Sequence, residues 1–406
     1  MKVNLNYFYV LLGQGSNYLF PLLIYPFLIS KMGLKSFGTF SLYVVITQFI
    51  VIIIEYGLAY SSANKISNLD VSQKTEYFCN VLGAKIIIFF IICIFFSAFF
   101  VLLNNDLKII VLYSLCAGLF TVFNPIWFFQ ATSNYKKLAI VSVLSKVITV
   151  LLIWWLIDNN DLFLAMGIFL LQYLLMSLIG FFYLKGFGLY FSGFDFQKSI
   201  KILKNSSSFF FSNLAISIYT LVTPIVLGIT AMKVEIATYN AISVIKQGLG
   251  GVVTPLVQVI YSNIIQNKLM DLERKEFHKH IKKKILFLMS MVGIVGVIGV
   301  IFSKQISLFI FGYSNKEIVY SIIITCITPV FIAFNTSFST FCFLALGKTD
   351  VLFSIVRNIS FLCLLFAYPV SKNWGAVGVI TLLFIVEILI GMIMLLVYRK
   401  ELKLGV

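Results

Sequence analysis

The sequence predicts an all-α membrane protein that crosses the bilayer about twelve times. Two features of the composition lead to this prediction: 60% of the 406 residues are hydrophobic, with a mean hydropathy of +1.02, and only 11% are charged. In addition, apolar stretches of about 20 residues, the length that spans a bilayer as a helix, recur along the whole chain. Soluble domains do not have this balance of residues.

Hydropathy defines the individual spans, and the N-terminal stretch is expected to be the first of them rather than a cleaved signal peptide. Turn sequences such as DNND and LGKTD separate several spans. The six cysteines are scattered through apolar segments without CxxC or Cys/His spacing, which argues against a metal site or a disulfide framework. The expected spans lie near residues 7–30, 37–59, 79–103, 109–131, 138–157, 162–183, 206–231, 237–262, 285–303, 317–345, 351–370 and 376–397.

The basic residues are distributed unevenly between the two sides of these spans. Twenty lie in segments on one side and seven in loops on the other, which by the positive-inside rule puts both termini in the cytoplasm. The same rule explains the net charge of +16 and the run RKEFHKHIKKK as a membrane anchor, so no nucleic-acid partner is expected. No loop on the outer side is long enough for a catalytic domain, and the chain is expected not to be an enzyme.

Two halves of the chain resemble each other weakly and in register. SNYLFPLLIYP in the first span matches SNLAISIYTLVTP in the seventh, and Lys146 follows Lys137 by the same nine residues that separate Arg357 from Lys348. Because six spans is an even number, the halves share one orientation, with a pseudo-twofold axis along the membrane normal. The predicted organisation is an N-terminal six-helix lobe over residues 1–184, a cytoplasmic interfacial linker over 185–205, and a C-terminal six-helix lobe over 206–406.

Four cations lie within the apolar spans: Lys85, Lys146, Lys246 and Arg357. A cation at the centre of a span costs about 2.5–3.5 kcal/mol on insertion scales, so such residues usually face a cavity or a partner. Lys85 is near a span end, where its side chain can reach the interface, and Lys85→Ala is expected to be mild. The other three are each flanked by polar residues at helical spacing, which predicts a hydrated, cationic cavity. The candidate binding residues are Lys146, Arg357, Lys246, Gln14, Asn17, Asn213 and Gln247; the alternative is that they hydrogen-bond helices together.

Only two acids lie within spans, Glu55 and Glu387. Each is expected either to pair with a cation or to take up a proton or sodium ion during transport. The remaining surplus of cations favours an anionic substrate such as a phosphate or pyrophosphate. The chain has no GxxxxGK[ST] loop, which disfavours transport driven by nucleotide hydrolysis.

The segment FNPIWFFQATSNYKKLAIVSVLSK resembles a signature of the bacterial Wzx-type polysaccharide flippases of the multidrug/oligosaccharidyl-lipid/polysaccharide (MOP) superfamily. PFLISKMGLKSFGTF, EYGLAYSSANKIS, ATYNAISVIKQ and NWGAVGVITLLFIVEILI are similar to further stretches of that family. The resemblance adds Gln130 to the candidate substrate-binding residues. The family often has an acid shortly after this glutamine, whereas this chain has Ala131, Thr132, Ser133 and Asn134, so the role of that acid cannot be carried over.

The resemblance implies a MATE-like fold and a multi-pass protein of the bacterial inner membrane. It implies an oligosaccharide repeat unit on undecaprenyl pyrophosphate as substrate, moved from the inner to the outer leaflet for O-antigen or capsule synthesis. No cofactor is expected beyond Na⁺ or H⁺ as a candidate coupling ion. A polysaccharide polymerase and a chain-length regulator are candidate partners, beside the lipid bilayer itself.

Two alternatives stay open at this point. A MATE-like ion-coupled drug exporter would be expected to have a cavity rich in acids. A polysaccharide polymerase would be expected to carry a sizeable outer loop with catalytic residues.

Overall fold

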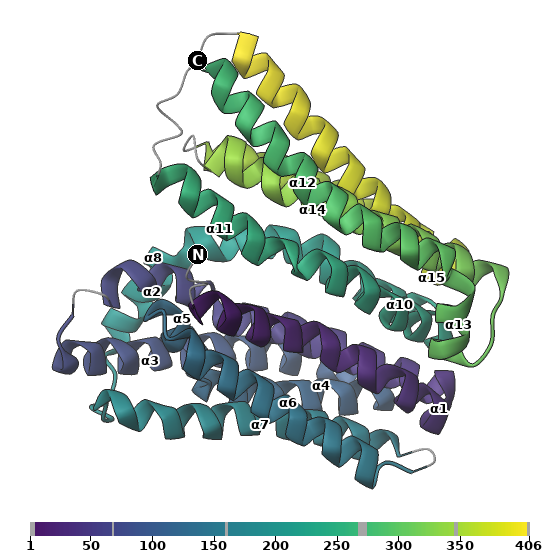
Figure 1. The fold of residues 1–406 in the computed structure, drawn as a ribbon. Coiled ribbons are helices and arrows are strands. Elements are labelled where there is room, and N and C mark those ends of the chain that lie inside the picture. Colours follow the sequence, from purple (N-terminus) through teal and green to yellow (C-terminus); the bar gives the residue numbers. More distant parts are fainter. Residues whose placement is uncertain (1–4, 67–68, 159–160, 267–273, 345–347, 404–406) are drawn as a thin grey trace. The chain divides into compact units, whose positions relative to one another are not determined.

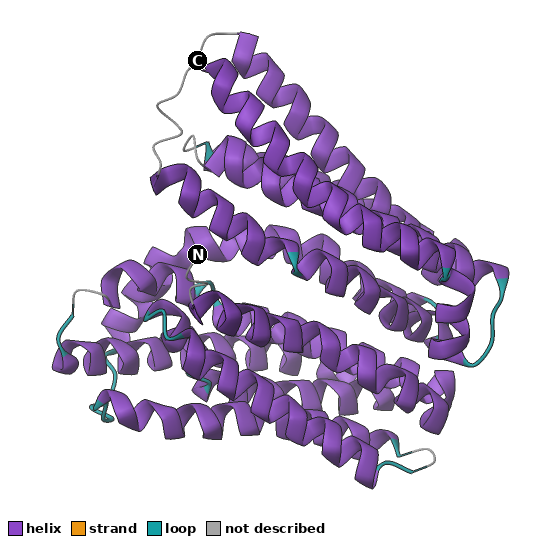
Figure 2. Cartoon of the chain, viewed as in Figure 1, coloured by secondary structure: helices purple, strands orange, loops and turns teal. Residues whose placement is uncertain are grey.

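The computed structural model describes the chain except for residues 1–4, 67–68, 159–160, 267–273, 345–347 and 404–406. The described residues are almost entirely helical, and no strand occurs among them (Figure 2). The prediction of an all-α fold is therefore confirmed.

The chain divides into two compact units, of which the first comprises Met1–Ser16 and Lys31–Ser217. Most of helix α1 (Leu5–Glu55) belongs to it (Figure 1). Within the unit, α6 packs against α7, α4 against α7 and α3 against α8. Its other helices are α2 (Leu58–Ile66), α3 (Val71–Phe99), η1 (Phe100–Leu102), α4 (Asn105–Phe123), α5 (Ile126–Ala131), α6 (Tyr135–Leu156), α7 (Leu162–Leu184), η2 (Lys185–Phe187) and α8 (Phe196–Ser217).

The second unit comprises Asn17–Ser30 and Ile218–Val406. Within it, α14 packs against both α12 and α15, and α9 packs against α15. Its helices are the π-helix η3 (Ile218–Val222), α9 (Thr223–Thr230), α10 (Lys233–Gly251), α11 (Val253–Gln266), α12 (Arg274–Ile301), α13 (Ser303–Phe311), α14 (Lys316–Phe338), the π-helix η5 (Ser339–Leu344) and α15 (Thr349–Lys403).

Eight helices of the described chain are long and apolar enough to cross a membrane. Two of them, α1 and α15, are each a pair of helices joined at a glycine, Gly33 or Gly375, and so cover two predicted spans each. The predicted spans 206–231 and 237–262 correspond to α8 with α9 and to α10 with α11, which are interrupted helices. The expected polytopic membrane protein is thus confirmed.

The break in α15 is fixed by a glycine and a carboxylate. Gly375 has φ 51° and ψ −138°, a conformation that residues with a side chain rarely adopt. A Cβ there would collide with the carboxylate of Glu235 at the start of α10. That carboxylate accepts the backbone N–H of Ala376 at 2.7 Å and so caps the second half of α15.

Asparagine and aspartate begin several other helices. Their side-chain oxygens accept N–H groups that would otherwise lack partners: Asp70 from Gln73 at 2.8 Å, and Asn104 from Leu107 at 2.9 Å. The hydrogen bond from Gln73 holds the pKa of the Asp70 carboxyl below its usual range.

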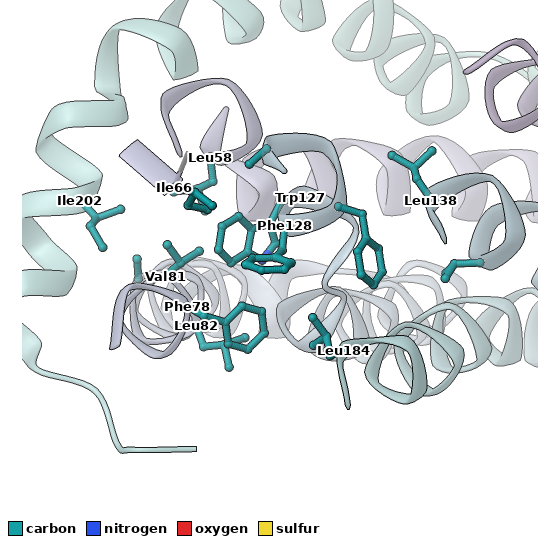
Figure 3. Close-up of a cluster of buried hydrophobic side chains, with 14 residues drawn as sticks. Leu58, Ile66, Phe78, Val81, Leu82, Trp127, Phe128, Leu138, Leu184 and Ile202 are labelled. Carbon is teal, nitrogen blue, oxygen red and sulfur yellow. The ribbon is translucent and has the colours of Figure 1, made fainter. Parts of the chain in front are cut away.

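The aromatic motif PIWFF forms part of the core of the first unit. Pro125 separates α4 from α5, and the short helix α5 buries Trp127, Phe128 and Phe129 completely. The Trp127 ring stacks on Phe78 of α3 with centroids 5.5 Å apart, and Leu58, Val81 and Ile202 complete the surroundings (Figure 3). The aromatic part of the segment that resembles the flippase signature is therefore a packing motif in this fold.

The segment 185–205, predicted as an interfacial linker, is part loop and part helix, and its place at an interface stays a prediction. It consists of η2, a loop over 188–195 with glycines of positive φ at 188 and 193, and the first turns of α8, which runs on without a break to Ser217. Asn80 of α3 holds it, because its side-chain oxygen accepts the N–H of Asp195 at 2.7 Å. The bounds of the two compact units differ from those of the predicted lobes, and the six-helix lobes stay a prediction.

Candidate functional site

Lys146 lies in the interior of the first unit, on the face of α6 that carries small hydroxyl residues. Only 6% of the residue is exposed, and Ser142, Ser145 and Thr149 on the same face are also buried. The Ser145 and Thr149 hydroxyls donate to carbonyls of their own helix at 2.8 Å, so the polar stripe predicted from the sequence is partly satisfied by α6 itself.

The Lys146 ammonium contacts α1. Its Nζ donates to Ser16 Oγ at 3.0 Å, while Ser16 Oγ donates in turn to the Gly13 carbonyl at 2.7 Å. The helices approach closely because Gly13 has no side chain: a Cβ there would lie 3.1 Å from Leu138 Cδ2. The structure therefore holds a buried ammonium against a neutral hydroxyl.

The side chain of Lys85 was expected to reach the membrane interface, but the structure buries it completely. Its Nζ lies 3.0 Å from Glu55 Oε1 and also contacts the carbonyls of Asn124 at 3.2 Å and Thr121 at 3.4 Å. Pro125 has no N–H to offer the Thr121 carbonyl, which accepts the Asn124 N–H at 3.1 Å at the end of α4 and the Lys85 ammonium beside it. Lys85 thus ties α1 to the end of α4.

Glu55 and Gln130 share a cavity of the first unit. This cavity has a volume of about 450 Å³, and its polar lining includes Glu55, Asn124, Gln130 and Tyr173. The side chain of Glu55 is 30% exposed, so one face of the carboxylate is open while Oε1 is bound to Lys85. The remaining lining is mostly apolar.

Glu387 is the centre of a polar cluster in the second unit. The residue is 8% exposed, and its carboxylate accepts the Asn335 side-chain N–H at 2.7 Å and the Tyr219 hydroxyl at 3.2 Å. Asn335 also donates to the Glu387 backbone carbonyl at 2.9 Å. Three helical elements, η3, α14 and α15, meet at this carboxylate.

Lys246 lies near this cluster. It is half-buried on α10, close enough to Glu387 for the two charges to interact. It lines a cavity of about 10 Å³, together with Tyr239, Ser243, Thr325 and Thr328. A cavity of this size has room for about one water molecule. The second unit therefore holds a lysine and a carboxylate near each other among hydroxyl groups.

Arg357 is exposed on α15, unlike Lys146. Its Nε lies 3.4 Å from the oxygen of its neighbour Asn358, and its guanidinium is 5.6 Å from the centroid of the Phe353 ring. Asn17 and Gln247 are also exposed. The side chains of Gln14 and Asn213 lie outside the described residues.

The predicted residues therefore form separate groups: Lys146 with Ser16, and Glu55 in the cavity with Gln130, lie in the first unit, whereas Lys246 and Glu387 lie in the second. In the described part of the chain, no three His, Cys, Asp or Glu residues come together as a metal site would require. Buried ammonium groups among hydroxyls can neutralise and hydrogen-bond an anion.

The sequence did not indicate three of these partners. Tyr219 and Asn335, which hold Glu387, are neutral residues 168 and 52 positions away from it. Ser16 is 130 residues from Lys146. For Lys85 and Glu55 a signal existed, because an acid and a base in neighbouring spans are natural partners.

Comparison with known proteins gives a family match over most of the chain. The model of the polysaccharide biosynthesis protein family matches residues 4–268. A protein of Escherichia coli K12 named "Putative O-antigen transporter" is 25% identical over 413 residues, covering 99% of this chain and 98% of its own length. A protein of the same name from Shigella dysenteriae is 23% identical, covering 96% and 98%.

Solved structures share the fold at low sequence identity. The lipid II flippase MurJ in an inward closed conformation aligns with a TM-score of 0.73 at 17% identity, covering 97% of this chain and 87% of its own. An inward-facing multidrug resistance MATE family transporter of the MOP superfamily aligns with a TM-score of 0.72 at 14% identity, covering 96% and 94%.

Proposed function

The chain belongs to the polysaccharide biosynthesis protein family, and from this premise we propose that it is a flippase for lipid-linked oligosaccharides. Two relatives that match over 98% of their length, each named "Putative O-antigen transporter", support this proposal. The fold shared with a lipid II flippase is compatible with it.

The substrate in this proposal is an oligosaccharide repeat unit on undecaprenyl pyrophosphate, destined for O-antigen or capsule. It moves from the inner to the outer leaflet of the bacterial inner membrane, with both termini of the protein in the cytoplasm. A polysaccharide polymerase and a chain-length regulator would act on the product.

The observation that carries the proposal is the buried ammonium of Lys146 beside the Ser16 hydroxyl. A diphosphate loses its hydration when it enters a low-dielectric region, and a fixed cation offsets part of that cost. Lys246 and the exposed Arg357 would supply further positive charge along the route, and Gln130 would contact the glycan. Gln14, Asn17, Asn213 and Gln247 remain candidate contacts for the same substrate.

The proposal includes the coupling of transport to Na⁺ or H⁺. Glu387 is the best-placed acid for Na⁺ or H⁺, because it is buried among Tyr219, Asn335 and Lys246, whose interactions with it would change if it bound a cation. Glu55 is already engaged by Lys85, which favours a structural role.

Deletion of the gene in its host tests the proposal. Complete lipid-linked repeat units should accumulate facing the cytoplasm, and surface polysaccharide should disappear. Intact surface glycan with lowered drug tolerance would instead identify a drug exporter. Single repeat units that reach the surface unpolymerised would identify a role in polymerisation.

A further inference from the structure

The first unit has a second cavity, distinct from the one that contains Glu55. It opens between α3, α4 and α7, beside the loop 188–195, and has a volume of about 520 Å³, within the usual range of ligand pockets. Its lining includes the buried apolar residues Phe78, Leu82 and Leu184, whose side chains are labelled in Figure 3. Among the lining residues that the structure describes, Lys185 is the single charged side chain.

The segment 188–195 is fixed against α3 in a way that leaves aromatic rings exposed. Asn80 accepts the Asp195 N–H at 2.7 Å, and its own carbonyl accepts the Ser199 hydroxyl at 2.9 Å. Tyr190 and Phe191, which line the cavity, remain 60% and 73% exposed. Fixed, exposed aromatic residues beside a lysine are typical of the boundary between lipid and water.

This end of the unit also has more cations than acids. Lys198 of α8 forms an ion pair with Glu76 of α3, and the Lys137 ammonium donates to the Tyr183 carbonyl at 3.2 Å. Lys185 is exposed and directly lines the cavity. The charged residues of the stretches 70–80, 135–137 and 183–204 are Lys74, Lys136, Lys137, Lys185, Lys198, Lys201 and Lys204 against Asp70, Glu76 and Asp195.

From the apolar cavity, the exposed rings and the local surplus of cations, we propose that this cavity binds one acyl chain of an anionic phospholipid and that Lys185 binds its phosphate. The occupant is a membrane lipid because α3, α4 and α7, which form the walls, are helices apolar enough to lie in a bilayer. An anionic headgroup gains the attraction of the surrounding lysines, whereas a headgroup without net charge does not. This site is independent of the transported substrate.

Lipid retention by the purified full-length protein tests the role of charge. The protein is equilibrated with equal amounts of phosphatidylglycerol and phosphatidylcholine, and native mass spectrometry measures the lipid that stays bound. Wild type should retain phosphatidylglycerol preferentially, and Lys185→Gln should lower that preference about fivefold, the effect of one lysine at a membrane surface. Lys108→Gln is the control, since Lys108 also lies near an aromatic ring, that of Phe100, but at the start of α4 and away from the cavity.

A second pair of variants tests the cavity itself. Leu178→Trp puts a larger side chain into the cavity, whereas Leu164→Trp changes an exposed leucine of the same helix that does not line it. Bound lipid should fall several-fold in the first variant and stay at the wild-type level in the second. Equal retention of both lipids by wild type, equal loss in both lysine variants, or full retention in Leu178→Trp would each overturn the proposal.

Discussion

The buried ion pair between Lys85 and Glu55 predicts a large loss of stability when one partner is removed. Lys85→Met keeps most of the side-chain volume but leaves Glu55 and the carbonyls of Thr121 and Asn124 without the ammonium that they share. Breaking a buried ion pair in this way costs about 3–5 kcal/mol. We expect about 3 kcal/mol, the lower end, because the Glu55 side chain is 30% exposed and can regain some water.

A double-mutant cycle separates the ion pair from other effects of substitution. Glu55→Gln alone leaves the ammonium of Lys85 buried against a neutral amide and should also be destabilising. The double variant Lys85→Met/Glu55→Gln removes both charges, so its cost should fall short of the sum of the single costs by about 1–3 kcal/mol. The free energies of unfolding are measured by denaturant titration in mixed micelles, followed by tryptophan fluorescence.

The exposed ion pair between Lys198 and Glu76 is the matched control in the same unit. Exposed pairs contribute little to stability, so Lys198→Met and Glu76→Gln should leave the unfolding midpoint unchanged. If Lys85→Met lowers the free energy of unfolding no more than Lys198→Met does, the buried ion pair does not stabilise the protein; a Lys85 at the membrane interface would give the same result. Additive costs of Lys85→Met and Glu55→Gln would likewise show that the two side chains do not interact.

Three further predictions concern the substrate route, a helix break and the core. Lys146→Ala and Arg357→Ala should each reduce transport of lipid-linked oligosaccharide to background while the protein stays inserted; normal transport at normal expression in both would exclude the cationic route. Gly375→Ala should destabilise the protein by about 1–3 kcal/mol, because φ of Gly375 is positive and the new Cβ would collide with the capping carboxylate of Glu235. The control Gly167→Ala lies in a helix with open space around it and should be neutral or slightly stabilising in the same unfolding assay. Trp127→Ala should cost about 3–5 kcal/mol, seen as lower yield and a lower unfolding midpoint, and a wild-type midpoint would mean that α5 is not part of the core.

Much of the fold follows from hydropathy, because a membrane span must be apolar over a fixed length. The breaks are harder to predict, since they depend on single residues in their surroundings. Gly375 ends one helix because Glu235, 140 positions earlier in the chain, caps the next. The segment 185–205 is predicted only as an interfacial linker, and the hydrogen bonds from Asp195 and Ser199 to Asn80, which hold the end of its loop and the start of α8 against α3, leave no signal in the sequence.

In the candidate site, too, the sequence periodicity predicts which residues share a helix face but not whether that face is buried. Lys146 and Arg357 occupy equivalent positions of the weak sequence repeat, and helical spacing predicts the same environment for both. The structure buries Lys146 and exposes Arg357. Periodicity defines the polar stripe of a helix, but the neighbouring helices decide whether that stripe is covered.

The four cations of the predicted spans differ in the side chains that surround their charges. The charge of Lys85 is compensated by Glu55, and that of Lys246 is partly compensated by the nearby carboxylate of Glu387. The Ser16 hydroxyl accepts a hydrogen bond from the buried ammonium of Lys146. In a low-dielectric surrounding a buried ammonium acts strongly on an approaching phosphate. The transport hypothesis is therefore tested most directly at Lys146.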